Sequence, residues 1–247
     1  MTMPRAVLHW YDFLCPFSYV GQHRNAILSR AGLDVVVLPF QAEPGIPPGG
    51  VPAGPRRGAA YTMVEQQARS AGLELHWPVK IPNSRCALAA AEWVRRHQPS
   101  AHHKVTARLF HAHFVLGEDI GDPAVVNRHL ALAYVDLRAV WAALGDGSAD
   151  AAVGEAEAAA RMHGVDRTPS WLIDDQLVVG LQSPGAFQKV ARDARDVHSA
   201  MADQRNEREK RDAIEAVRRH PHGNRRRDRA TDIGCVRATG RIPDDDR

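Results

Sequence analysis

The segment that most constrains the fold is residues 5–40, where the hydrophobic pattern changes twice. "RAVLHWYDFL" (5–14) is rich in β-branched and aromatic residues and predicts a buried strand. From Pro16 the apolar residues fall on a helical stripe that ends at Gly32, and "LDVVVLPF" (33–40) predicts a second buried strand. The order strand, helix, strand is a βαβ unit, and its crossover is expected to be right-handed.

The remainder of the chain is predicted to be helical in its middle and mixed near its end. A helical block lies between the βαβ unit and a last group of elements, which begins with a helix over 150–164. "PSWLIDDQLVVG" then predicts a β-hairpin, and Ser183-Pro184 opens another helix as N-cap and first residue. We therefore expect an α/β domain of residues 1–45 and 150–200, an inserted all-helical domain of 46–149, and a charged tail of 201–247.

Composition and charge exclude several classes of function. Of the 247 residues, 44% are hydrophobic, yet no apolar run approaches the roughly 20 residues of a membrane span and no signal-peptide pattern opens the chain. We expect a cytoplasmic protein with no membrane partner. Residues 1–202 carry 19 Lys+Arg and 19 Asp+Glu, so a nucleic-acid partner is not expected of the globular part. The basic excess lies in the tail, which is predicted to be disordered beyond Pro221.

Cys15 lies at the junction between the first strand and the first helix. The amino end of a helix offers unpaired N–H groups and a positive dipole, and both favour a thiolate, so we expect a lowered pKa for Cys15. Pro16 suits the first helical position because it needs no hydrogen bond there. Ser18 lies one turn on, where its hydroxyl can donate to the sulfur but cannot form a disulfide.

A second half of the site is predicted at Thr168-Pro169, directly before a strand. An X-Pro bond there can be cis, which would expose the backbone of Thr168. An extended peptide or glutathione could then pair with that backbone as an added strand.

The strings "DFLCPFSYVGQHR", "IPNSRCALAAAEWVRR" and "GVDRTPSWLIDDQLVVGLQSP" together resemble the DsbA-like thioredoxin superfamily over residues 5–198. The nearest group is the FrnE-like branch, which adjoins 2-hydroxychromene-2-carboxylate isomerases and kappa-class glutathione transferases. The resemblance implies a thioredoxin-like fold with an inserted helical domain that roofs the groove above the active site. It also implies roles for individual residues: Cys15 as nucleophile, Pro16 and Phe17 as the dipeptide that tunes it, Pro169 as the cis-proline, and Gln182 as a glutathione contact.

Ser18 departs from the dithiol pattern of that superfamily, which has a second cysteine at this position. In a dithiol oxidase the second cysteine attacks the mixed disulfide and releases the partner. The isomerase and transferase branch, in turn, usually has serine where this chain has Cys15. The sequence therefore leaves monothiol exchange and glutathione-linked chemistry both open.

Other candidate residues are interpreted more plainly. Cys86 lies among alanines and is expected to pack in the core, and Cys235 is expected to be an incidental thiol, although either could be a resolving thiol. The histidines of "AHHKVTARLFHAHF" are not expected to bind a metal, because His111 and His113 do not share a helical face. Asp12 either modulates the Cys15 thiolate or ends the strand.

Three functions follow in order of preference. The first is a DsbA-family thiol-disulfide oxidoreductase that uses Cys15 and Ser18 for mixed-disulfide exchange with a thiol-containing protein or small molecule. The second is a glutathione-dependent isomerase or transferase acting on a small aromatic or polyketide-like compound. The third is a non-catalytic binding protein. No tightly bound cofactor is expected, with glutathione a possible co-substrate, and the oligomeric state is not predicted.

Overall fold

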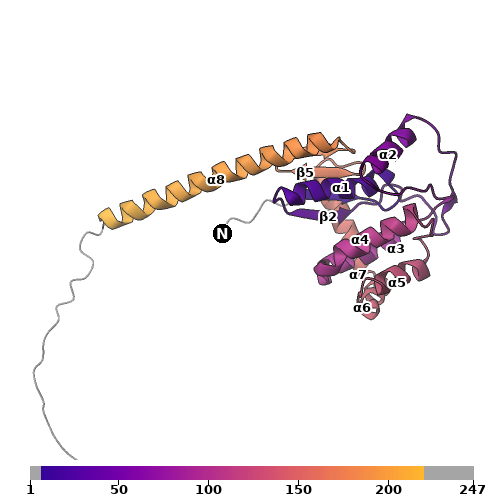
Figure 1. Cartoon of the computed structure of the whole chain (residues 1–247). Helices are drawn as coiled ribbons and strands as arrows, with labels where there is room; N and C mark the ends of the chain where they lie inside the picture. The colour runs from indigo at the N-terminus through magenta and orange to yellow at the C-terminus, as the bar shows by residue number, and fades with distance from the viewer. Residues whose placement is uncertain (1–6, 220–247) are drawn as a thin grey trace, which may run out of the picture. The chain divides into compact units, whose positions relative to one another are not determined.

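The computed structural model describes residues 7–219, and the chain divides into two compact units, Met1–Met201 and Ala202–Arg247. The first unit contains a four-stranded sheet and the helices around it (Figure 1). Cys235 and the predicted disorder beyond Pro221 lie outside the described residues. No helix in the described range is long and apolar enough to cross a membrane.

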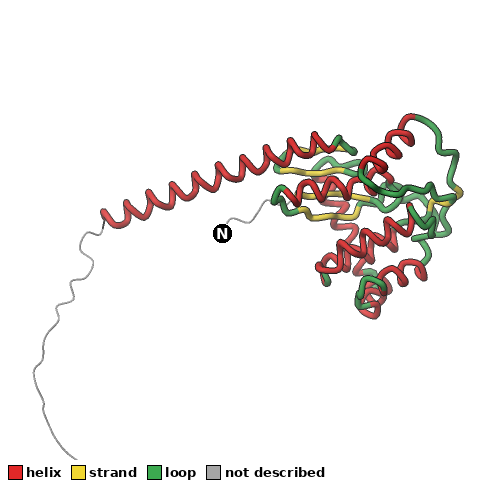
Figure 2. The backbone as a smooth tube through the Cα atoms, in the orientation of Figure 1, coloured by secondary structure: helices red, strands yellow, loops and turns green. Residues whose placement is uncertain are grey.

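The strands are yellow in Figure 2, and those of the four-stranded sheet have the order β2-β1-β5-β6. Its strands are β1 (Val7–Tyr11), β2 (Val35–Pro39), β5 (Ser170–Ile173) and β6 (Gln176–Val179). β1 and β2 run parallel, joined through α1 (Pro16–Arg30), whereas β5 pairs antiparallel with both β1 and β6. The predicted βαβ unit and hairpin are therefore confirmed. The antiparallel pairing of β1 with β5 brings two strands that are about 160 residues apart in the sequence into one sheet.

α1 packs closely on the sheet because Gly21 has no side chain. A Cβ atom at this position would lie 3.2 Å from the Trp171 ring, tighter than ordinary van der Waals contact. The Trp171 indole stacks on the His9 imidazole at 4.4 Å between ring centroids and donates to the Asn25 side chain at 2.8 Å. Asn25 also bonds His9 at 2.8 Å, so this buried polar group ties α1 to β1 and β5.

The middle of the chain is helical, as predicted, and shares its core with the sheet. Its helices are α2 (Ala59–Ser70), α3 (Arg85–His97), α4 (Pro99–Phe114), α5 (Pro123–Ala131), α6 (Leu137–Gly145) and α7 (Ser148–Met162). α3 to α7 form one block in Figure 1. Tyr11, Phe13 and Tyr19 pack in the same buried cluster as Phe110 and Phe114 of α4, so the helical block is continuous with the wall of the Cys15 site.

One element departs from the sequence prediction. The segment "HWPVKIP" was expected to be a loop, but β4 (Lys80–Ile81) pairs antiparallel with β3 (Val51–Pro52). Each strand is only two residues long and lies in a Pro-rich stretch, so neither carries a readable alternation. The pair holds the Pro/Gly-rich connection against the helical block.

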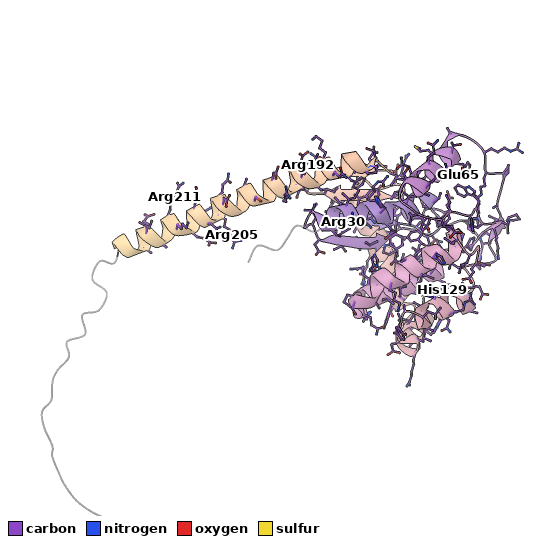
Figure 3. All side chains as sticks on the ribbon, in the orientation of Figure 1. Arg30, Glu65, His129, Arg192, Arg205 and Arg211 are labelled. Carbon is purple, nitrogen blue, oxygen red and sulfur yellow. The ribbon has the colours of Figure 1, made fainter. Side chains whose placement is uncertain are left out.

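The last helix, α8 (Pro184–Arg219), begins in the first unit. Ser183 caps it by accepting from the Ala186 N–H at 3.2 Å, as predicted. Beyond the first unit the helix is polar and carries i,i+4 ion pairs such as Arg205–Glu209 at 3.0 Å. Arg205 and Arg211 of this part are labelled in Figure 3.

Candidate functional site

Cys15 is the N-cap residue of α1, and Pro16 is the first residue of the helix. The Cys15 N–H donates to the Asp12 carbonyl at 3.1 Å, and its own carbonyl accepts from the Tyr19 N–H at 3.1 Å. These bonds fix the turn that leads from β1 into α1. The sulfur is therefore held at the amino end of the helix, as the sequence predicts.

Thr168 faces Cys15 from the other half of the chain. The Thr168-Pro169 peptide bond is cis, in agreement with the prediction, and the Cys15 Sγ donates to the Thr168 carbonyl at 3.3 Å. The two lie together because Trp10, near the end of β1, pairs with Ser170 at the start of β5. The structure thus joins the two halves of the site that the sequence placed 153 positions apart.

Ser18 is fully buried and supports the sulfur directly. Its hydroxyl oxygen accepts from the Asp12 N–H at 3.5 Å, which leaves its proton free to be donated to Cys15. Hydrogen bonds from the Ser18 hydroxyl and N–H and from Thr168 act to lower the pKa of Cys15. The serine is consequently part of the sulfur's environment and does more than open the helix.

The expected lowering of the Cys15 pKa is wrong for the resting protein. Burial is the largest influence and raises the pKa of Cys15 above its ordinary value, outweighing the hydrogen bonds from Ser18 and Thr168. The helix dipole can be inferred from the sequence, whereas desolvation depends on the folded surroundings of the sulfur. The direction of the pKa change agrees with the geometry, in which the Cys15 thiol donates to the Thr168 carbonyl.

Asp12 organises the loop below the sulfur. Its carboxyl group accepts from the Leu14 N–H at 3.1 Å and from the Ala42 N–H at 2.9 Å, which joins the ends of β1 and β2. Burial raises the pKa of this carboxyl group, and its charge makes only a small contribution to raising the pKa of Cys15. Of the two roles considered for Asp12, the structural one is the larger.

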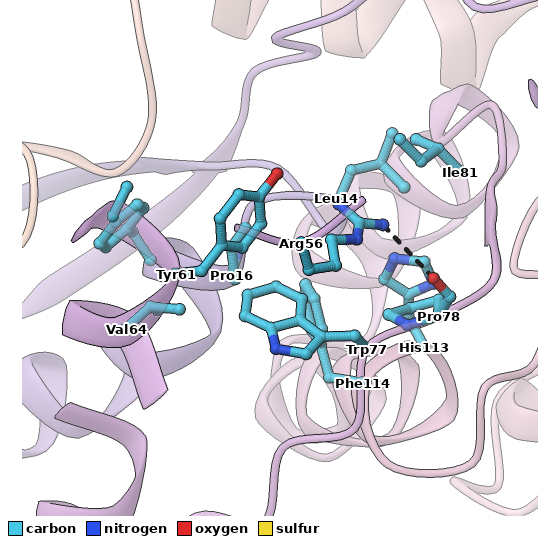
Figure 4. Close-up of a pocket in the computed structure, with 12 residues that line it drawn as sticks. Leu14, Pro16, Arg56, Tyr61, Val64, Trp77, Pro78, Ile81, His113 and Phe114 are labelled. Carbon is cyan, nitrogen blue, oxygen red and sulfur yellow. Dashed lines mark hydrogen bonds between the residues drawn. The ribbon is translucent and has the colours of Figure 1, made fainter. Parts of the chain in front are cut away.

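A pocket of about 260 Å³ is lined by Leu14 and Pro16, the residues on either side of Cys15 (Figure 4). Its walls come from the active-site turn, the Pro/Gly-rich connection, α2, the segment 77–81 and α4: Leu14, Pro16, Phe17, Arg56, Ala60, Tyr61, Val64, Trp77, Pro78, Ile81, His113 and Phe114. Most of these side chains are apolar or aromatic. Pro16 and Phe17, the dipeptide predicted to tune the site, are among the lining residues.

Two polar side chains in this pocket have unpaired buried nitrogens. Arg56 lies 5.4 Å from the Trp77 ring centroid and donates to the Pro78 carbonyl at 3.3 Å, but its Nε atom has no hydrogen-bond partner among the described residues. His113 is 3% exposed, its Nδ1 atom is also unpaired, and burial lowers its pKa to about 4. Buried nitrogens of this kind normally have an acceptor, a water or a ligand as partner.

Apart from Pro16 and Phe17, the pocket residues were not predicted from the sequence. Arg56 lies in a stretch interpreted only as a connection, and His113 was considered only as a metal ligand. The one available signal was Arg56-Arg57 at the end of a Pro/Gly-rich run before a helix, which is a common setting for functional loops.

The remaining predicted site residues lie farther from the sulfur or have no contact with it. Gln182 is exposed; its side chain donates to the Val179 carbonyl at 3.1 Å, and its backbone carbonyl accepts from Arg24 at 3.0 Å. Cys86 packs against the helical core, and burial raises its pKa; like Cys15, it is a free thiol. Within residues 7–219, no group of His, Cys, Asp and Glu side chains is arranged to hold a metal ion.

Comparison with known proteins identifies the family. The profile of the DSBA-like thioredoxin domain matches residues 6–192, three quarters of the chain. The chain belongs to the DSBA-like thioredoxin family. No curated sequence is similar enough to count as a relative.

Several solved structures share this DSBA-like fold. A probable DsbA oxidoreductase from Streptomyces coelicolor is 23% identical, with 76% of this chain and 89% of that chain covered and a TM-score of 0.64. The cytosolic disulfide reductase DsbM from Pseudomonas aeruginosa, solved with GSH, is 17% identical (80% and 99% covered, TM-score 0.55). A 2-hydroxychromene-2-carboxylate isomerase is also 17% identical (83% and 98% covered, TM-score 0.56). At these identities the likeness establishes the thioredoxin-like fold and leaves the reaction to be argued from the site.

Proposed function

We propose that this DSBA-like chain is a monothiol, glutathione-linked thiol-disulfide oxidoreductase. The observation that carries the proposal is the Cys15 sulfur held 3.3 Å from the Thr168 carbonyl and hydrogen-bonded to Ser18, beside an open pocket. Because a serine cannot enter a disulfide, exchange runs through one protein sulfur and an external thiol. The fold neighbour named a disulfide reductase and solved with GSH supports this choice.

The reaction needs two exchanges. Cys15 loses its proton, and the thiolate attacks the glutathione sulfur of a glutathionylated substrate, which forms a Cys15–glutathione disulfide and releases the substrate thiolate. A second glutathione thiolate then attacks that disulfide at the glutathione sulfur. Glutathione disulfide leaves, and Cys15 returns as a thiolate that is reprotonated. The net change is reduction of the substrate disulfide by one glutathione equivalent, with glutathione disulfide as the oxidised product.

The residues around Cys15 have separate parts in this scheme. Ser18 stabilises the Cys15 thiolate in both exchanges, and the Thr168 carbonyl, which holds the resting thiol, is freed when the proton leaves. The pocket of Pro16, Phe17 and Arg56 receives the thiol-containing protein or small molecule. A cytoplasmic location belongs to the same proposal, because a glutathione pool keeps such a site reduced.

The test is reduction of a glutathionylated peptide by glutathione, followed as release of glutathione disulfide. We expect wild type to catalyse it, Cys15→Ser to fall to the uncatalysed rate, and the matched variant Cys86→Ser to keep most of the activity. Full activity in Cys15→Ser would overturn the proposal. Absence of activity in wild type would leave the binding-protein interpretation.

A second candidate function is a glutathione-dependent isomerase or transferase. The observation that favours it is the aromatic pocket with the unpaired Arg56 Nε atom, which suits an apolar compound with an acceptor group. In that reaction the thiol of glutathione, rather than Cys15, is the nucleophile. Tight glutathione binding that survives Cys15→Ser, measured by calorimetry, would favour this function, whereas loss of binding would favour exchange.

A further inference from the structure

α4 carries a second pocket, of about 570 Å³, that the thiol chemistry does not use. Five of its lining residues belong to α4 and lie about one turn apart on one face of the helix: His103, Lys104, Ala107, Arg108 and His111. The other two are Leu116 of the following loop and His129 of α5. Ala107, the smallest lining residue, lies between the long basic side chains. His113, which lines the Cys15 pocket, does not line this one.

The second pocket is basic and has no acidic residue in its lining. Neither Lys104 nor Arg108 forms an ion pair within residues 7–219, and Lys104 instead lies 4.5 Å from the ring centroid of Tyr134. Glu118 contacts one lining residue, His129, at 2.6 Å, and its carboxylate is also bonded to Arg128 at 2.8 Å. Since residues 1–202 are neutral overall, this concentration of positive charge is local.

Two nitrogen atoms in the same pocket are buried without a partner among the described residues. They are Arg108 Nε and His129 Nδ1. His129 is only 4% exposed, and its side chain is labelled in Figure 3. Its Nε2 atom donates to the Glu118 carboxylate, which fixes the ring and leaves Nδ1 without a partner. A buried, unpaired polar group is costly, and the unpaired Arg108 N–H, which can only donate, indicates a ligand that accepts hydrogen bonds.

We infer that this pocket binds a phosphate group, either as free phosphate or as a phosphate monoester. The Arg108 guanidinium and the Lys104 ammonium together match a compact oxyanion with several acceptor oxygens. A cation is a poor fit, because Lys104 and Arg108 repel it and no metal-binding group is present in the described range. The site is independent of the thiol chemistry at Cys15 and survives if the proposed function fails.

The test is calorimetric titration of the full chain with inorganic phosphate and, separately, with phenyl phosphate, against sodium chloride of matched ionic strength. Tighter binding of phenyl phosphate would assign the site to a monoester whose body rests on Leu116, and equal or weaker binding would assign it to free phosphate. The variants are Arg108→Gln and the exposed Lys104→Gln. Arg161→Gln, on α7 and outside the pocket, is the matched control for loss of one positive charge.

We expect Arg108→Gln to weaken phosphate binding about tenfold or more and Lys104→Gln to weaken it severalfold, because each removes a charge-assisted hydrogen bond. Arg161→Gln should bind as wild type does. Far-UV circular dichroism checks folding, and if Arg108→Gln does not fold, Lys104→Gln decides the outcome. No phosphate binding by wild type, or equal weakening in Arg161→Gln and the pocket variants, would overturn the inference.

Discussion

Asp12, Cys15, Ser18 and Thr168 surround the reactive sulfur and are called here the sulfur wall. The polar side-chain atoms of the sulfur wall all have hydrogen-bond partners. The lining of the neighbouring pocket includes Arg56, Tyr61, Trp77 and His113, called here the pocket wall, and two of its nitrogens have no partner among the described residues. The first arrangement is complete without a ligand.

This difference in hydrogen bonding indicates different roles for the two walls, one in the reaction and the other in binding. Groups whose hydrogen bonds are already made hold the reacting sulfur in one geometry, which favours a fixed reaction centre. Unpaired nitrogens reduce the stability of the free protein and are compensated only when an acceptor arrives. Changes to the sulfur wall should therefore alter the chemical step, and changes to the pocket wall should alter binding.

The largest expected effect is acid destabilisation through the buried histidines near each wall. Burial lowers the pKa of His9 to about 3 and that of His113 to about 4, below the unfolded value of 6.5. The unfolded chain therefore binds protons that the folded chain does not, and stability falls as pH drops from 6.5 towards these values. Between pH 7 and pH 5 each histidine should cost about 2 kcal/mol of unfolding free energy.

Urea unfolding at the two pH values measures this loss. His113→Phe should lose about 2 kcal/mol less than wild type over the same range, because only the contribution of His113 is removed. An equal loss in both proteins would show that His113 is protonated freely in the folded state, and the pocket wall would then not be buried as described.

The next effect in size concerns the sulfur wall. Ser18→Ala removes the hydroxyl that lowers the Cys15 pKa and leaves the Asp12 N–H unpaired, so alkylation of Cys15 at pH 7 should slow by about tenfold or more. Ser29→Ala, an exposed position on the same helix, is the control and should match wild type. If Ser18→Ala reacts as fast as wild type, the serine has no role in activating the thiol.

Arg56→Met tests the pocket wall. It keeps the apolar contact with Trp77 and removes the unpaired Nε, so KM for the glutathionylated peptide should rise by about tenfold while kcat stays within about twofold. The unfolding free energy of the free protein should stay the same or increase. Arg57→Met, one residue along and exposed, should change neither constant. A fall in kcat at constant KM would show that Arg56 acts in the chemical step and not in substrate binding.

The smallest effect is expected at Gln182. Its side chain is exposed and bonded only to Val179, so a contact with glutathione there would be a surface contact. Gln182→Ala should raise KM for glutathione by about threefold, with Gln188→Ala on α8 as control. Identical KM values in the two variants would remove Gln182 from the site.

The sequence allowed the sulfur wall to be predicted and not the pocket wall. Cys15, Pro16 and Ser18 form one local motif, and Thr168-Pro169 is a second, so both could be read from short stretches whose periodicity also marks β1, α1, β5 and β6. Arg56 and His113 meet only through the tertiary fold, since one lies in a Pro-rich connection and the other in α4. The direction of the Cys15 pKa was wrong for the same reason, because desolvation depends on residues distant in sequence.

Cys15 and Cys86 offer the most direct test of the central claim, that the sulfur wall makes Cys15 the reactive thiol. Both are free, part-buried thiols near the start of a helix, and burial raises both pKa values. Only Cys15 has the hydrogen bonds of Ser18 and Thr168 and a pocket beside it. The folded protein is treated with glutathione disulfide and each cysteine peptide is quantified over time by mass spectrometry. We predict that Cys15 is glutathionylated first and that Cys86 reacts only after unfolding in urea; modification of Cys86 at an equal or higher rate in the folded protein would contradict the account.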